Sequence, residues 1–370
     1  MIPRDFSLER YFARYEFSTR YLLCSSDPES LSTGELLALE PDAGAGLRDV
    51  WLGYTQSLGD PDLRRAIAAS YASVDAENVL VHCGAEEPIF SFANVALQPG
   101  DGIVFQFPAY QSHYSVAQAL GVEASRWKSD LARGGAPDPD DLADLIGPNT
   151  RAIVLTSPNN PTGYAFDRER LDAVVALARK RGLWLFSDEV YRGSEREPEA
   201  RHPSVCDLYE RGISLGGMAK AYGLPGLRIG WVATRDRTLY RKMAEFKDYV
   251  TICNAAPSEF LAKLALRHQD WLLERIRKIV LRNLELLDEF FAARSDLFQW
   301  HRPPAGTTAF PRYLGGSSES FCHELARKAG VLLLPSTVFD AGDDRIRIGY
   351  ARANLPEALA AFEAALPARR

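Results

Sequence analysis

Short apolar runs alternate with amphipathic, helix-like segments through the middle of the chain. Between two of these runs, apolar residues recur at the helical spacing i, i+3, i+4, i+7 (Leu171, Val174, Val175 and Ala178). Asp167 is placed to cap that helix and Gly182 to end it. The pattern predicts strands over 78–82, 102–107, 152–156, 183–186, 213–215 and 229–233, with a further helix over 86–96. Strands that alternate with helices indicate parallel strands in an α/β layer.

The pattern changes after about residue 255. A long helical stretch covers 257–294 with a possible break near His268, and shorter elements follow: 307–313, a helix over 319–329, strands over 331–334 and 345–348, and a closing helix from Pro356. The first 45 residues lack strand signals, so we expect them to pack against the second domain or a partner subunit. We therefore predict a large domain over 46–260 and a smaller α+β domain formed by 1–45 and 261–370.

Composition and charge narrow the class of protein. The chain has 370 residues and a formal net charge of −6, with no block of basic residues, so we expect no nucleic-acid partner. No apolar run is long enough to cross a membrane, and the N-terminus has no continuous apolar core, so we expect neither a membrane anchor nor a signal peptide. The five scattered cysteines indicate a cytoplasmic protein, and the six histidines are not spaced as metal ligands, so we expect no metal.

Two polar motifs follow predicted strands directly. Residues 157–163 (SPNNPTG) form a tight loop at a strand's carboxyl end, where ligands of open α/β sheets bind; an ordinary turn is the alternative. Asp188, in the segment SDEVY, ends another strand among apolar neighbours. A carboxylate in that position needs a cationic partner, although it could instead cap a helix.

Lys220 differs from the other lysines because it lies among small residues directly after a strand (GGMAKAYGLPG, 216–226). A lysine in an apolar pocket has a lowered pKa and can attack a carbonyl group as an amine. Arg228, eight residues later, could meet a phosphate. Gly84, Ala85 and Glu86 join a strand to a helix, whose first backbone N–H groups can bind an anion.

In this order, the three blocks SPNNPTG, SDEVY and SLGGMAKAYGLPGLRIGW resemble the class I/II aminotransferases, which are fold type I enzymes dependent on pyridoxal 5′-phosphate (PLP). The resemblance covers nearly the whole chain. It implies a large α/β domain with a mostly parallel central sheet flanked by helices, and a smaller α+β domain.

The resemblance also implies roles for single residues. Lys220 corresponds to the lysine that forms a Schiff base with PLP and then moves a proton at the substrate Cα. Asp188 corresponds to the partner of the pyridine nitrogen, and Tyr191 and Asn160 to the donors to the phenolic oxygen. Tyr110 corresponds to the aromatic residue stacked on the cofactor ring.

Further contacts follow from the same resemblance. Arg347 resembles the arginine that binds the substrate α-carboxylate, and Asn160 is also expected to contact the substrate. Tyr54 resembles a tyrosine that reaches the phosphate of the neighbouring subunit, so we expect a homodimer with shared sites. One departure is Gly217, where the family often has a hydroxyl residue, and Ser214 lies too far away to replace it. The phosphate is expected to contact Gly84, Ala85, Glu86 and Arg228.

The motifs leave the reaction open. The family favours an aminotransferase acting on an α-amino acid and an α-keto acid. Residues 220–228, 306–312 and 330–335 are also similar to capreomycidine synthases, which indicates as an alternative a PLP-dependent lyase, cyclase or oxidase acting on arginine or a hydroxylated arginine. Asp27 or Glu29 could then reach a guanidinium group, although a solvated loop is an equal alternative. A regulator with an aminotransferase-like domain is disfavoured because the family blocks begin near Tyr54 and leave little chain for a DNA-binding domain.

Overall fold

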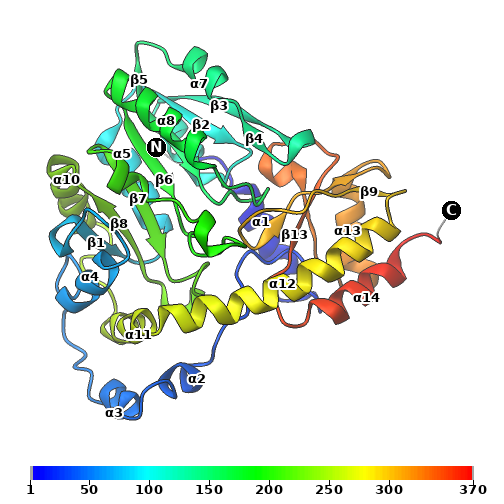
Figure 1. The fold of residues 1–370 in the computed structure, drawn as a ribbon, viewed down its shortest axis with the longest axis horizontal. Helices are drawn as coiled ribbons and strands as arrows, with labels where there is room; N and C mark the ends of the chain where they lie inside the picture. Colours follow the sequence, from blue (N-terminus) through cyan, green and yellow to red (C-terminus); the bar gives the residue numbers. More distant parts are fainter. Residues whose placement is uncertain (1–2, 369–370) are drawn as a thin grey trace.

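A computed structural model describes residues 3–368. Its central feature is an eight-stranded sheet in the order β1-β8-β7-β6-β5-β2-β3-β4, covered by helices (Figure 1). The strands are β1 (Val79–His82), β2 (Gly102–Phe107), β3 (Glu123–Asp130), β4 (Ala136–Pro137), β5 (Thr150–Thr156), β6 (Trp184–Asp188), β7 (Gly212–Gly217) and β8 (Gly230–Thr234). The helices of this part are α4 (Pro61–Ala68), α5 (Glu86–Ala96), α6 (Ser112–Ala119), α7 (Pro139–Leu145), α8 (Arg168–Arg181), α9 (Val205–Leu208), α10 (Arg237–Lys247) and α11 (Ala256–Arg267).

The second part of the molecule is built on small sheets. The three-stranded sheet has the order β10-β13-β12, and β11 pairs with β9. Its strands are β9 (Phe298–Gln299), β10 (Thr308–Ala309), β11 (Arg312–Tyr313), β12 (Leu334–Pro335) and β13 (Ile346–Gly349), and its helices are α12 (Gln269–Ala293), α13 (Ser318–Ala329) and α14 (Leu355–Ala365). The long helix α12 runs from α11, beside the large sheet, across to α14 (Figure 1).

The predicted elements of the large sheet are largely confirmed. The helix over 86–96 and the strand over 102–107 have the predicted bounds. Asp167 caps α8 by accepting a hydrogen bond from Arg170 N at 2.8 Å, and Gly182 ends it in the left-handed conformation at φ 65°. The break near His268 is also confirmed, since His268 separates α11 from α12. In these segments the local signals agree with the tertiary structure, as minimally frustrated sequences require.

The sheet is mostly parallel, as predicted, and its antiparallel pairs involve β8 and β4. Strands β3, β2, β5, β6 and β7 are parallel, whereas β8 is antiparallel to both β7 and β1, and the short β4 is antiparallel to β3. For β8, the physical reason is the connection between β7 and β8. Residues 218–229 contain no α-helix, and a parallel pair needs a crossover connection that is usually helical.

The N-terminal residues divide between the two parts. Helix α1 (Ser7–Tyr15) and Cys24 pack in the hydrophobic core of the small sheets. Helices α2 (Thr33–Leu37) and α3 (Ala43–Arg48) pack instead on α11, beside the large sheet. We call the residues packed around the eight-stranded sheet the large lobe, and those packed around the small sheets the small lobe. The division into 46–260 and the remainder stays a proposal; its boundary at 260/261 falls within α11.

Within residues 3–368, no helix combines the length and the apolar character needed to span a bilayer.

Candidate active site

A cavity of about 300 Å³ lies where the large lobe meets the small lobe and the N-terminal segment. Strands β5, β6 and β7 deliver loop or terminal residues to it from their carboxyl ends, which is where open α/β sheets bind ligands. The structure brings nine of the predicted site residues into its lining: Ala85, Glu86, Tyr110, Asn160, Asp188, Tyr191, Lys220, Arg228 and Arg347.

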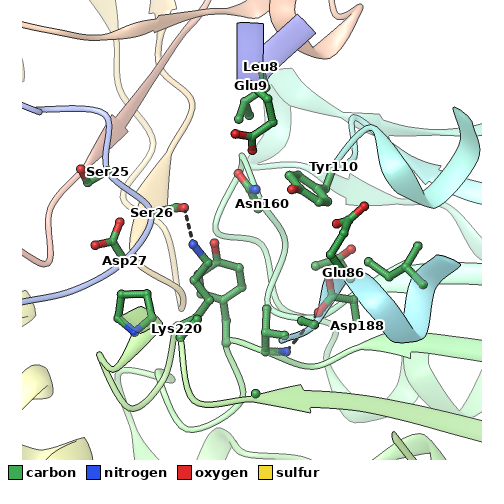
Figure 2. Close-up of a pocket in the computed structure, with 18 of the residues that line it drawn as sticks. Leu8, Glu9, Ser25, Ser26, Asp27, Glu86, Tyr110, Asn160, Asp188 and Lys220 are labelled. Carbon is green, nitrogen blue, oxygen red and sulfur yellow. Dashed lines mark hydrogen bonds between the residues drawn. The ribbon is translucent and has the colours of Figure 1, made fainter. Parts of the chain in front are cut away.

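Lys220 follows the end of β7 and carries its amine into the cavity. Its Nζ donates a hydrogen bond to Ser26 Oγ at 2.8 Å, as Figure 2 shows. Burial lowers the pKa of Lys220, although the carboxylates of Asp27 and Asp188 oppose the shift. Because its pKa is lowered, a larger fraction of the amine is neutral at a given pH, and the neutral amine is the reactive form.

Asp188 is the last residue of β6 and is 6% exposed. Its Oδ1 accepts a hydrogen bond from Val190 N at 3.1 Å, and its Oδ2 lies 3.0 Å from His113 Nε2. The sequence analysis missed His113. A signal was present, because His113 follows Tyr110 by three residues at the start of α6, and that spacing brings two side chains to one side of a helical turn.

Arg347 comes from β13 of the small lobe and is 1% exposed. Its Nη1 donates to Asn160 Oδ1 at 3.1 Å, and its Nε and Nη2 donate to the carbonyl oxygen of Cys24 at 3.2 and 2.8 Å. A guanidinium group has five N–H donors, so two remain for a ligand. Burial lowers the pKa of Arg347, but an arginine stays charged in proteins.

A candidate anion site lies between the N-terminus of α5 and Arg228. No side chain caps α5, whose N-cap residue is Ala85, so its first backbone N–H groups are left for another acceptor. Gly84 has φ +77°, and a Cβ added there would come within 2.4 Å of Arg228 Nη2. The left-handed backbone at Gly84 favours glycine, and a Cβ there would displace the guanidinium group of Arg228 from its position.

The structure also bears on the missing hydroxyl at Gly217. Gly217 lines the cavity, and the nearest atom to an added Cβ there would be Ile229 O at 3.5 Å. Ser214 is engaged elsewhere, because its Oγ donates to Glu189 Oε1 and accepts from Cys206 N, both at 3.1 Å. These hydrogen bonds support the expectation that Ser214 does not replace the hydroxyl, which stays a prediction.

Two tyrosines form the aromatic part of the cavity. The ring of Tyr110 packs against Phe6 with centroids 5.0 Å apart. Tyr191 is 3% exposed, and burial raises its pKa to about 12, so its hydroxyl stays protonated. Tyr191 Oη makes no hydrogen bond of normal geometry among the described residues, and its polar neighbour is Ser26, whose Oγ accepts from Lys220. A buried hydroxyl in that state is suited to donate to a bound ligand.

Tyr54 does not reach the cavity of its own chain. It is 84% exposed and stands beside the exposed side chains of Trp51 and Leu52. Its role at a neighbouring subunit stays a prediction.

Three carboxylates of the N-terminal segment also line the cavity. Glu9 and Glu16 line the cavity, and burial raises the pKa of Glu16. Asp27 also lines it, paired with Arg352. Glu29 does not; its carboxylate accepts a hydrogen bond from Ala353 N at 2.9 Å, on the small lobe. The sequence analysis missed Glu9 and Glu16, although with Phe12 they have the i, i+3, i+7 spacing of one helix face.

Comparison with known proteins identifies the family. The family model for aminotransferases of class I and II matches residues 21–362, so the chain belongs to that family. Capreomycidine synthase from Streptomyces vinaceus is 33% identical, over 97% of this chain and 91% of that protein. A crystal structure of a PLP-dependent aminotransferase from Streptococcus suis superimposes with a TM-score of 0.93 at 32% identity, over 98% of each chain. The PLP-dependent cyclase OrfR gives a TM-score of 0.90 at 29% identity, over 98% of this chain and 97% of that one.

The protein is therefore a fold type I enzyme, and its cofactor is pyridoxal 5′-phosphate. The residues of the cavity fit that group. The uncapped helix α5 and Arg228 suit a phosphate, the carboxylate of Asp188 suits a protonated ring nitrogen, and the buried, protonated hydroxyl of Tyr191 suits a ring oxygen.

Proposed function

We propose that this chain is an aminotransferase that moves an amino group between an α-amino acid and an α-keto acid, with Lys220 as its Schiff-base lysine. One observation carries the proposal. The amine of Lys220, the carboxylate of Asp188 and the guanidinium group of Arg347 all line one cavity. These are the nucleophile, the anion and the carboxylate receptor that the reaction needs.

The cofactor would be held at three points. The phosphate would lie against α5 and Arg228, where backbone N–H groups and a cation are available. Asp188 would hold the ring nitrogen in its protonated form, and His113 would orient that carboxylate. Asn160 Oδ1 already accepts from Arg347, so its amide NH₂ is left to donate to the ring oxygen beside Tyr191.

When bound, the cofactor supplies an electron sink for the charge that develops at the substrate Cα. The remaining steps belong to the side chains of this chain. Arg347 would bind the substrate α-carboxylate with its two remaining N–H groups and so fix the Cα beside Lys220. Lys220 Nζ would take the proton from Cα and return it to the cofactor, and its lowered pKa favours the neutral form that accepts a proton.

A second reaction has a specific observation in its favour. Glu9, Glu16 and Asp27 line the same cavity, and their carboxylates suit a guanidinium or ammonium group of a substrate. The chain is also similar to capreomycidine synthase and to the cyclase OrfR. Together with these carboxylates, that similarity supports elimination, cyclisation or oxidation of arginine or a hydroxylated arginine as the alternative reaction. The Lys220, Asp188 and Arg347 core would serve either reaction.

We also propose a homodimer, in which Tyr54 reaches the phosphate of the second subunit. Its exposure, together with that of Trp51 and Leu52, supports an interface at this surface. The free state of all five cysteines is compatible with a cytoplasmic location, which we keep as part of the proposal.

The test is a half-reaction. The PLP form is mixed with single amino acids, including arginine and hydroxyarginines, without a keto acid, and the products are identified by mass. One equivalent of keto acid and of pyridoxamine phosphate supports the aminotransferase. A dehydrated, cyclised or oxidised product with the PLP form retained supports the alternative. Full turnover by a Lys220→Ala variant would reject both.

A further inference from the structure

We propose that Ser26 is a positioning residue that holds the free amine of Lys220 in place when the small lobe is closed over the cavity. This inference rests on the role proposed for Lys220, and it adds a residue that the family motifs do not contain. The contact that carries it is the hydrogen bond from Lys220 Nζ to Ser26 Oγ, at 2.8 Å (Figure 2).

Ser26 reaches Lys220 from the small lobe. Thr307 Oγ1 donates to the carbonyl oxygen of Ser26 at 2.6 Å, and the preceding Cys24 carbonyl accepts from Arg347. Asp27, which follows, pairs with Arg352. The backbone on both sides of Ser26 is thus fixed to small-lobe residues, whereas Lys220 extends from the large sheet. A movement between the lobes would make or break the contact between Ser26 and Lys220.

The chemistry of the acceptor suits a lysine that must react. A hydroxyl orients the amine without stabilising the ammonium form as strongly as a carboxylate would. The charged groups that act on Lys220 include Asp27, Asp188, Glu9 and Glu16, which favour the ammonium form, and Arg347, which opposes it. The hydrogen bond that the structure gives to Nζ nevertheless goes to the neutral hydroxyl. The amine can then remain both oriented and available as a base.

The proposed role is confined to the free amine. Lys220 has a free amine in two situations: before it bonds to the cofactor aldehyde, and after a substrate amino group has displaced it. In the second situation the amine must remain beside the Cα that Arg347 positions. Ser26 and the Arg347 anchor at Cys24 are two residues apart, so the segment that contacts the carboxylate receptor also holds the base.

The test compares Ser26→Ala, Ser26→Thr and the neighbouring control Ser25→Ala in the full-length enzyme. Two quantities are measured. The first is the rate of the half-reaction with the best amino acid, resolved into kcat and KM. The second is the pH dependence of acylation of Lys220 in the cofactor-free protein, followed by mass spectrometry of the Lys220 peptide. Ser25 is a suitable control because it precedes Ser26 in the same segment, while the hydrogen bond of Lys220 goes to Ser26 (Figure 2).

We expect Ser26→Ala to lower kcat about tenfold, as expected for one lost hydrogen bond, with KM within about twofold. The midpoint of Lys220 acylation should move to lower pH, because the ammonium form loses an acceptor. Ser26→Thr should restore both quantities, and Ser25→Ala should stay within about twofold of the parent.

Equal kcat and equal acylation midpoints for Ser26→Ala and the parent would overturn the inference. An equal loss of kcat in Ser25→Ala would also overturn the inference, because the loss would then come from a general disturbance of the segment and not from the hydroxyl of Ser26. If Lys220→Ala is inactive while Ser26→Ala is normal, only the role of Ser26 is rejected. If Lys220→Ala is active, the proposed function itself is rejected.

Discussion

Arg347 and Asn160 are 187 positions apart in the chain and lie in different lobes, yet Arg347 Nη1 donates to Asn160 Oδ1 at 3.1 Å. The same guanidinium group is held by the carbonyl oxygen of Cys24. Two parts of the small lobe and one loop of the large lobe therefore meet at a single buried side chain. Its orientation depends on contacts from both lobes, which makes Arg347 a sensitive point for mutation.

Replacing Arg347 with Ala should raise the KM for the amino acid and lower kcat/KM by about 100-fold, the scale of a lost charge-assisted pair. Arg347→Lys should recover only part of this loss, because an ammonium group cannot bind a carboxylate with two parallel hydrogen bonds. The measurement is steady-state kinetics with the best substrate. A normal KM in Arg347→Ala would show that the carboxylate binds elsewhere.

Gly84→Ala should weaken PLP binding by about tenfold or more. The added Cβ would come within 2.4 Å of Arg228 Nη2, and the residue would have to keep φ +77°. Gly226→Ala is a matched control in the same region, since a Cβ there meets nothing within 4 Å and its φ is not in the left-handed region. Cofactor affinity is measured by absorbance titration of the cofactor-free protein. Equal affinities in the two variants would argue against a phosphate site at Gly84.

Lys220 should make the stability of the cofactor-free protein depend on pH. Its folded-state pKa is lowered below 10.5, mainly by burial, so between that lowered value and 10.5 the unfolded chain binds more protons. The free energy of unfolding should therefore gain a contribution that increases with pH in this window. The Lys220→Met variant should lack this pH-dependent contribution. Urea unfolding of both proteins at several pH values measures the difference, and parallel curves would contradict a lowered pKa.

The same shift predicts a pH effect on the half-reaction. Only the neutral amine accepts a proton, so the rate should rise with pH through an acid limb with an apparent pKa below 10.5. Stopped-flow absorbance at saturating amino acid measures this limb. Activity independent of pH over the range would indicate that Lys220 is not the base.

Leu52→Glu should convert the proposed dimer to monomer and abolish activity with it. Leu52 is 81% exposed beside Trp51 and Tyr54, and a carboxylate buried at an interface without a partner is strongly unfavourable. Sedimentation velocity gives the oligomeric state, and Phe17→Glu, at a residue that is 96% exposed, tests whether any added charge has the same effect. A dimeric, active Leu52→Glu enzyme would exclude this surface as the interface.

Much of this molecule follows from local sequence. Neighbouring residues set the caps of α8, the break at His268 and the bounds of α5 and β2. Periodicity and capping signals therefore predicted these features. The resemblance to the family predicted a shared site for Lys220, Asp188 and Asn160, and the sequence pattern placed each at or after the carboxyl end of a strand. Parallel strands bring such ends to one edge of the sheet, whatever the rest of the chain does.

Only the tertiary structure decided which distant groups complete that site. The antiparallel direction of β8, the pairing of His113 with Asp188 and the contact of Ser26 with Lys220 depend on chain segments meeting in space. Ser26 and Lys220 are 194 positions apart, and no local periodicity or cap links them. Such contacts result from the packing of whole lobes, whose free energy is spread over many buried side chains rather than encoded in any one motif.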